Sequence, residues 1–273
     1  MPIQIIKSLF TKTPKLSVGS TPPMPPLDLR RLVGPTEEAA FDNPSGNFIW
    51  GPLDFSPLKP GEAYEAVFDF GCGCGRNARQ LMLQKEAPKK YLGIDISKRM
   101  ISWARETLSA CNPNFRFEFH DVYSPNKEYA PNNTRGNRML PFPSGDKEFT
   151  LINAHSVYTH LCPDQTEFYM KESARILSDK GIMRTTWFLF NKKFFPPMGP
   201  HLDCLYINLQ DPTHAVYYDW EYILNLLHSL NLAIISVDWT KIPGFQNVIW
   251  IGKASTFKDL SAEITPPKNI IGF

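Results

Sequence analysis

The sequence predicts an α/β fold in which a mostly parallel sheet carries helices on both of its faces. From residue 66 onward, short apolar runs alternate with segments whose apolar residues recur at helical spacing. This alternation is typical of parallel strands joined by crossover helices. The chain has 273 residues, of which 42% are hydrophobic and 21% charged, so it is long enough to bury a large core.

The first half of this region is expected to contain four strands and two helices. The strands are "AVFDF" (66–70), "YLGID" (91–95), "FRFEFHD" (115–121) and "FTLIN" (149–153). A glycine-rich turn follows the first strand and leads into a helix over residues 77–84. Ser97 is expected to cap the second helix, because Met100, Ile101, Ala104 and Leu108 follow it at helical spacing.

The second half adds three strands, which brings the total to seven. Asp164 is the expected N-cap of a helix over residues 165–177, with Glu167 in capping-box register. The strand "GIMRTTWFLF" (181–190) follows, and Asp219 opens a last helix that ends near Asn231. The runs "LAIISVDW" (232–239) and "NVIWIGK" (247–253) are expected to pair antiparallel around the turn "KIPGF".

Composition divides the chain into three regions: an N-terminal arm over residues 1–60, a main domain over 61–257 and a C-terminal tail over 258–273. Eleven of the 25 prolines fall in the arm, so "TPPMPPLDLRRLVG" is expected to be extended, without a regular helix. Apolar residues such as Phe41, Phe48 and Trp50 predict that the arm folds back over the main domain. An irregular insertion over 191–217 is interpreted as a substrate lid or a structural excursion.

The run "FDFGCGCGR" (68–76) allows three interpretations. A metal site needs about four ligands, and no second Cys/His cluster is near, so no metal is predicted. One-residue spacing suits a redox disulfide poorly, and the five scattered cysteines are expected to be reduced. The favoured interpretation is a strand-to-helix turn in which Gly71, Gly73 and Gly75 adopt positive φ and let a nucleotide-type cofactor approach the main chain.

The stretch from Asp69 to Gly75 resembles motif I of the class I S-adenosylmethionine-dependent methyltransferases. Asp95 in "GIDIS", Asp121 in "HDV" and the run "FTLINAHSVYTHL" continue the resemblance over roughly residues 60–255. It implies a Rossmann-like seven-stranded sheet with an antiparallel last strand, and S-adenosyl-L-methionine as the cofactor.

By this resemblance, Gly71 and Gly73, in a loop completed by Cys72 and Gly75, pack against the methionine moiety. Asp69 and Asn153 serve the methionine end, Asp95 accepts the ribose hydroxyls, Ile96 and Met100 cover the adenine, and Asp121 with the Val122 amide binds its amino edge. Each residue also has a plainer interpretation. Asp69 and Asp95 would then be solvated strand ends, Asp121 a turn former, and Met100 and Cys72 packing residues.

His155 and His160 follow the fourth strand, and either imidazole has a suitable pKa to accept a proton from a hydroxyl group. The alternative is that either histidine only caps a helix or binds a loop. The place that holds an Asn/Asp-Pro-Pro-aromatic motif in nucleic-acid methylating relatives reads "NAHS" here. The net charge is only +2, so nucleic acid is not an expected partner.

The expected activity is therefore O-methylation of a small, partly apolar acceptor such as a natural product, a glycoside or a lipid-linked sugar. Three alternatives stay open: an NAD(P)-dependent oxidoreductase, a non-catalytic S-adenosylmethionine-binding protein, and N-methylation of a small amine. Residues 3–10 form only a short apolar stretch broken by Lys7, so we expect no membrane insertion and a cytoplasmic location. The oligomeric state is left open.

Overall fold

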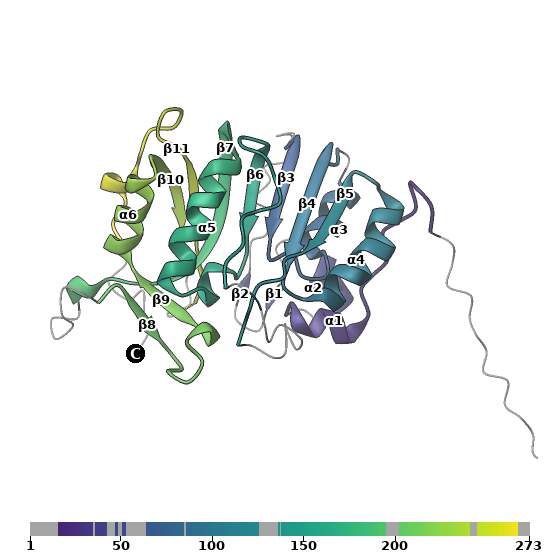
Figure 1. Ribbon diagram of the computed structural model, residues 1–273, viewed down its shortest axis with the longest axis horizontal. Coiled ribbons are helices and arrows are strands. Elements are labelled where there is room, and N and C mark those ends of the chain that lie inside the picture. The colour runs from purple at the N-terminus through teal and green to yellow at the C-terminus, as the bar shows by residue number, and fades with distance from the viewer. Residues whose placement is uncertain are drawn as a thin grey trace, which may run out of the picture.

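The computed structural model describes residues 16–34, 36–42, 47–48, 51–52, 64–84, 86–125, 136, 138–194, 202–240 and 245–266. Its centre is a sheet whose strands lie side by side in the order β10-β11-β7-β6-β3-β4-β5 (Figure 1). In chain order these are β3 (Ala66–Phe70), β4 (Lys90–Asp95), β5 (Phe115–Phe119), β6 (Phe149–Ala154), β7 (Leu177–Phe190), β10 (Leu232–Asp238) and β11 (Asn247–Lys253).

The directions of the strands confirm the predicted fold class. β3 pairs parallel with both β4 and β6, while β5 and β7 extend the parallel set at either side. β11 runs antiparallel to its two neighbours, β7 and β10. Because the parallel strands all end at one edge of the sheet, the turns after β3, β4, β5 and β6 converge there.

Helices cover both faces of the sheet, as predicted. Neighbouring residues of one strand belong to different buried clusters, one on each face of the sheet. Val67 and Leu151 pack with α3 (Arg76–Leu83) and α4 (Lys98–Cys111). Phe68 and Ile152 face the other way and pack with α5 (Pro163–Ile176) and α6 (Trp220–Ser229). Successive strand residues point to opposite faces, so each strand end presents its polar residues between two apolar layers.

Two of the three predicted helix N-caps are confirmed, and one was wrong. Ser97 caps α4, and Asp219 caps α6 by accepting a hydrogen bond from the Tyr222 amide. The prediction that Asp164 caps the next helix was wrong, because α5 begins at Pro163 with Cys162 in the N-cap position. Proline fits the first turn of a helix, where its missing N–H costs nothing.

The proline-rich arm contains a helix, so the prediction of a wholly extended segment was wrong. α1 (Leu27–Leu32) begins directly after Pro26, which precedes the first turn and does not interrupt it. α2 (Glu38–Asp42), β1 (Asn47–Phe48) and β2 (Gly51–Pro52) follow. Figure 1 shows α1 and α2 beside the carboxyl ends of β3 and β4. Side chains of residues 43–63 lie outside the described part of the chain.

Phe41 of the arm is fully buried against the main domain, in a cluster with Leu29, Cys74 and Met100. Its carbonyl accepts hydrogen bonds from Arg76 Nε at 3.2 Å and from Gln80 Nε2 at 2.9 Å. The next residue, Asp42, accepts two hydrogen bonds from Arg79, at 2.7 and 2.9 Å. The arm is thereby fastened to α3, the helix that follows the glycine turn.

The region over residues 191–217 is more regular than the sequence suggested. It holds β8 (Cys204–Tyr206), and β9 (Val216–Asp219) extends from its end to pair antiparallel with β8 and parallel with β7. Four short 3-10 helices complete the described elements: η1 (Tyr158–His160), η2 (Lys192–Phe194), η3 (Pro212–His214) and η4 (Ser261–Glu263). Residues 195–201, and 241–244 of the predicted "KIPGF" turn, lie outside the description.

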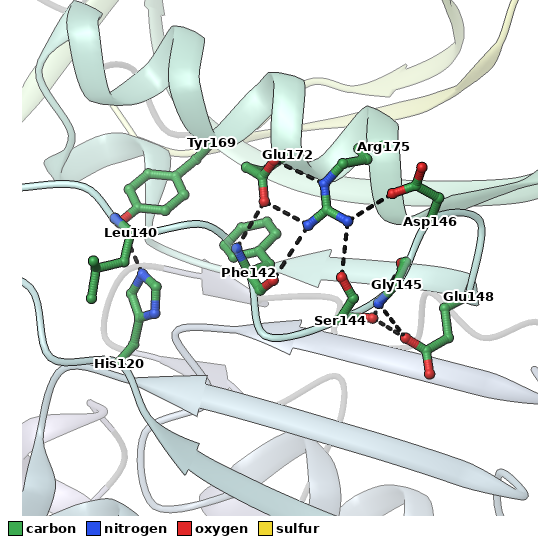
Figure 2. A network of polar contacts seen from close by, with 10 residues as sticks. All are labelled: His120, Leu140, Phe142, Ser144, Gly145, Asp146, Glu148, Tyr169, Glu172 and Arg175. Atoms are coloured by element: carbon green, nitrogen blue, oxygen red, sulfur yellow. Dashed lines mark hydrogen bonds and ion pairs between the residues drawn. The ribbon is translucent and has the colours of Figure 1, made fainter.

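A polar network fixes the segment that leads into β6 (Figure 2). Arg175 donates to Glu172 at 2.7 Å, to Asp146 at 2.9 Å and to the carbonyl of Ser144 at 2.8 Å. Glu172 also accepts the Phe142 amide at 2.8 Å. The segment over residues 142–146 is therefore held against α5.

In the part of the chain described here, no helix is long and apolar enough to cross a membrane.

Candidate functional site

The turn after β3 has the backbone that its glycines predicted. Gly71, Gly73 and Gly75 have φ angles of 74°, 55° and 82°, in the left-handed region that glycine adopts without steric cost. The amides of Gly71 and Cys72 both donate to the carbonyl of Ile94, at 2.8 and 3.0 Å. The turn is thus held against the end of β4, and α3 begins directly after Gly75.

Asp95, the last residue of β4, lies against this turn. One carboxylate oxygen accepts the Gly73 amide at 2.8 Å, and the other accepts the Ser97 amide at 2.7 Å. Burial raises the pKa of Asp95 to about 6, against the opposing effect of these two backbone hydrogen bonds. The structure therefore brings Asp95, the neighbouring Ile96 and the glycine turn together.

Asp69 and Asn153 occupy paired positions on β3 and β6 and are hydrogen-bonded to each other. Asp69 is 1% exposed and accepts from Asn153 Nδ2 at 2.7 Å, from the Tyr91 hydroxyl at 2.6 Å and from Asn77 Nδ2 at 3.3 Å. Burial raises the pKa of Asp69, and these donors oppose the rise. Asp69 is therefore not the solvated strand end of the plainer interpretation.

Arg184 of β7 extends this network, and sequence reasoning did not identify it. Its guanidinium is buried, and Nη1 lies 3.2 Å from Asn153 Oδ1 and 3.3 Å from His155 Nδ1. The signal in the sequence was a charged residue inside the otherwise apolar and hydroxyl-bearing run "GIMRTTWFLF". A charge is rarely buried unless it has partners, so that position pointed to a polar cluster.

The two candidate histidines sit in different surroundings after β6. His155 contacts Arg184, and burial together with the charges of Arg184 and Arg76 holds its pKa well below the usual value. The Nδ1 of His160 lies 2.9 Å from the carbonyl oxygen of Thr213, in η3. Burial lowers the pKa of His160 too, although its backbone hydrogen bonds oppose this.

The turn after β5 holds Asp121 and Val122, the two residues expected at the amino edge of the adenine. Asp121 is exposed, and the Val122 amide donates to the carbonyl of His120 at 2.9 Å, so this amide already has a partner within the chain. His120 itself is buried and bonds through Nε2 to the Tyr169 hydroxyl at 2.9 Å (Figure 2). Burial lowers the pKa of His120 to about 4, so it is neutral at pH 7.

Met100 and Cys72 are both buried, and their predicted roles toward the cofactor stay predictions. Met100 is 1% exposed beneath the N-terminal arm, and Cys72 packs between the glycine turn and the helices of the same face. All five cysteines are free thiols. Burial raises the pKa of Cys72 well above its usual value and that of Cys74 to about 12, so both thiols stay protonated and unreactive at pH 7.

This geometry defines a class of protein: an α/β protein that binds a nucleotide-type cofactor at the carboxyl edge of its sheet. A turn with glycine at alternate positions opens a helix, and a carboxylate with two acceptor oxygens ends the adjacent strand. These residues fit S-adenosylmethionine, because a carboxylate can accept both hydroxyls of a ribose diol.

Comparison with known proteins agrees with this class. The methyltransferase domain family matches residues 67–181. An uncharacterized methyltransferase of Schizosaccharomyces pombe is 30% identical over 118 residues, which are 42% of this chain and 75% of that protein. The chain belongs to the methyltransferase family: it is a class I S-adenosylmethionine-dependent methyltransferase, and S-adenosyl-L-methionine is its cofactor.

Solved structures with a similar arrangement include two at low sequence identity. A protein of Pyrococcus horikoshii is 17% identical, with a TM-score of 0.47 over 72% of this chain and 85% of its own. The magnesium protoporphyrin IX methyltransferase of Synechocystis, solved with bound S-adenosylmethionine, is 16% identical, with a TM-score of 0.44 over 70% of this chain and 71% of its own.

Proposed function

We propose that this methyltransferase transfers the methyl group to an oxygen atom of a small, partly apolar acceptor, and that His160 accepts the hydroxyl proton. The single observation that carries the proposal is the contact between His160 Nδ1 and the Thr213 carbonyl, at 2.9 Å. A carbonyl oxygen only accepts hydrogen bonds, so Nδ1 carries the proton of the neutral ring and Nε2 keeps a lone pair.

Burial supports the same role for His160. Because burial lowers its pKa, the ring is neutral at pH 7 and able to take up a proton. The contact also joins the turn after β6 to η3 of the 191–217 region, which we propose forms a wall of the acceptor site. Small aliphatic or sugar hydroxyls are poorly acidic, and they need such a base during transfer.

The residues that we assign to the cofactor lie at or directly after the carboxyl ends of the strands. We assign Asp95 to the ribose, the main chain of Gly71 and Gly73 to the methionine moiety, and the Asp69–Asn153 pair to the amino acid end. S-adenosylmethionine would supply a methyl group on a sulfonium, whose sulfur leaves as a neutral thioether when the bond to the methyl carbon breaks. The protein's own contribution is then to align the acceptor oxygen and remove its proton.

The net charge of +2 and the sequence "NAHS" after β6 support a small molecule over a nucleic acid as acceptor.

The first test is calorimetry, in which S-adenosylhomocysteine should bind and NAD should not. Methyl transfer is then measured on a panel of hydroxylated metabolites. His160→Asn keeps a donor for the Thr213 carbonyl but has no basic nitrogen. It should lower kcat about 100-fold or more while the cofactor affinity stays unchanged. His228→Asn is the matched control, since His228 is half-exposed on α6 and is not assigned to the site.

Two results would overturn the proposal. Full activity of His160→Asn on an active acceptor would remove His160 as the base. Transfer to amines alone, with no hydroxylated compound methylated, would exclude an oxygen acceptor.

A further inference from the structure

We infer that Arg184 is a positioning residue that fixes the tautomer of His155, so that this imidazole carries its proton on Nε2 and can donate a hydrogen bond but not accept a proton at Nδ1. The inference deepens the proposed function and rests on it for the site that the two histidines serve.

Arg184 constrains its partners because a guanidinium group can only donate hydrogen bonds. Arg184 Nη1 lies 3.3 Å from His155 Nδ1 and 3.2 Å from Asn153 Oδ1. A guanidinium has only donors, so both of its partners must be acceptors at these atoms. Nδ1 of His155 therefore holds a lone pair, and the single proton of the neutral ring sits on Nε2.

The other end of the network excludes the reverse orientation of the Asn153 amide group. Asp69 accepts from Asn153 Nδ2 at 2.7 Å, which fixes the amide group with its oxygen toward Arg184. The Tyr91 hydroxyl donates to the other Asp69 oxygen at 2.6 Å. A carboxylate that only accepts and a guanidinium that only donates thus set the direction of every bond between them.

Burial and charge keep His155 neutral. Arg184 is 2% exposed and Asp69 1%, and Asn153 separates the two charges as a neutral bridge. The chain of contacts crosses the adjacent strands β4, β3, β6 and β7. A proton added to His155 would place a second positive charge beside the buried guanidinium, which is strongly unfavourable in such surroundings. His155 is therefore held neutral as well as in one tautomer.

The two histidines after β6 thus have opposite tautomers. A carbonyl oxygen holds the Nδ1 proton of His160, whereas a guanidinium occupies the Nδ1 lone pair of His155. Of the two histidines predicted as candidate bases, we therefore retain His160 and not His155. His155 is suited to donate through Nε2–H to an oxygen of a neighbouring group.

The test is ¹⁵N NMR of the full chain labelled at its histidines, with His155→Asn used for assignment. At pH 7 the wild-type protein should show an unprotonated Nδ1 and a protonated Nε2 for His155. Arg184→Lys retains a donor and should preserve this pattern. Arg184→Met should shift the Nδ1 signal and let His155 titrate at higher pH, with the His160 signals unchanged. Arg116→Met, an exposed arginine on β5, is the matched control.

A wild-type His155 protonated on Nδ1 would overturn the inference, and so would an Nδ1 signal that does not respond to Arg184→Met in a folded variant. If Arg184→Met does not fold, the wild-type and Arg184→Lys spectra still decide the tautomer. The readout does not depend on methyl transfer. A protein with the expected spectrum but no activity on hydroxylated acceptors would therefore contradict only the proposed function.

Discussion

Protonation of Asp95 should weaken cofactor binding. In the structure its two carboxylate oxygens accept the amides of Gly73 and Ser97, and in the proposed complex they also accept the ribose hydroxyls. Burial raises the pKa of Asp95 to about 6. As the pH falls through this value, the carboxylate gains a proton and loses acceptor capacity, so affinity is full above pH 7 and is lost below pH 6.

The size of the effect follows from that pKa. If only the charged form binds, a pKa of about 6 leaves roughly 99% of the protein competent at pH 8 and about 9% at pH 5. The dissociation constant of S-adenosylhomocysteine should therefore rise about tenfold, which corresponds to about 1.4 kcal/mol.

The assay is calorimetric titration of S-adenosylhomocysteine at pH 8, 7, 6 and 5 at constant ionic strength. Asp95→Asn should bind at least about tenfold more weakly at pH 8, because it loses hydrogen bonds to a charged acceptor, and its remaining affinity should change little with pH. Asp69 is present in both proteins, so the difference between their two pH profiles reports the effect of Asp95 alone. Wild-type affinity that is constant from pH 8 to 5, or Asp95→Asn binding as tightly as wild type, would refute the assignment.

Two further predictions concern stability, both measured by urea unfolding. Gly75→Ala should cost more than Gly19→Ala: both have positive φ, but a Cβ at Gly75 would lie 2.4 Å from Leu108 Cδ1, whereas nothing lies within 4 Å at Gly19. We expect about 1 kcal/mol for Gly19→Ala and at least twice that for Gly75→Ala, and equal losses would show that the turn relaxes. Phe41→Ala should cost about 3–5 kcal/mol, against almost nothing for exposed Val18→Ala, and a negligible loss would mean that the arm does not contribute to the core.

The sequence predicted the sheet well because its central strands are buried on both faces and glycines mark the turn after β3. "AVFDF" is β3 residue for residue, and "NVIWIGK" is β11. Helix starts were less certain. Pro163 can begin a helix as well as end one, so Asp164 and Glu167 gave a plausible capping box two residues too late. The same ambiguity concealed α1 behind Pro26.

Part of the site was also visible in the sequence. Asp95 and Gly73 lie 22 residues apart, yet they meet because parallel strands end at one edge of the sheet. Arg184 and Tyr91 escaped notice because no local pattern relates them to Asp69. Their side chains meet only after β4, β3, β6 and β7 have aligned in register.

The sequence alone therefore determined the order of strands and helices along the main domain and the left-handed glycine turn, because these depend on local periodicity and on residue types at fixed spacing. The cofactor was implied by the resemblance of its motifs to the methyltransferase family, which the comparison confirms. Tertiary structure decided which polar side chains share buried space: the Asp69–Asn153–Arg184–His155 chain and the different environments of His155 and His160. It also decided that Phe41 of the arm is buried against the main domain. A buried polar group takes its role from the partners that folding brings within hydrogen-bonding distance, and those partners lie on distant parts of the chain.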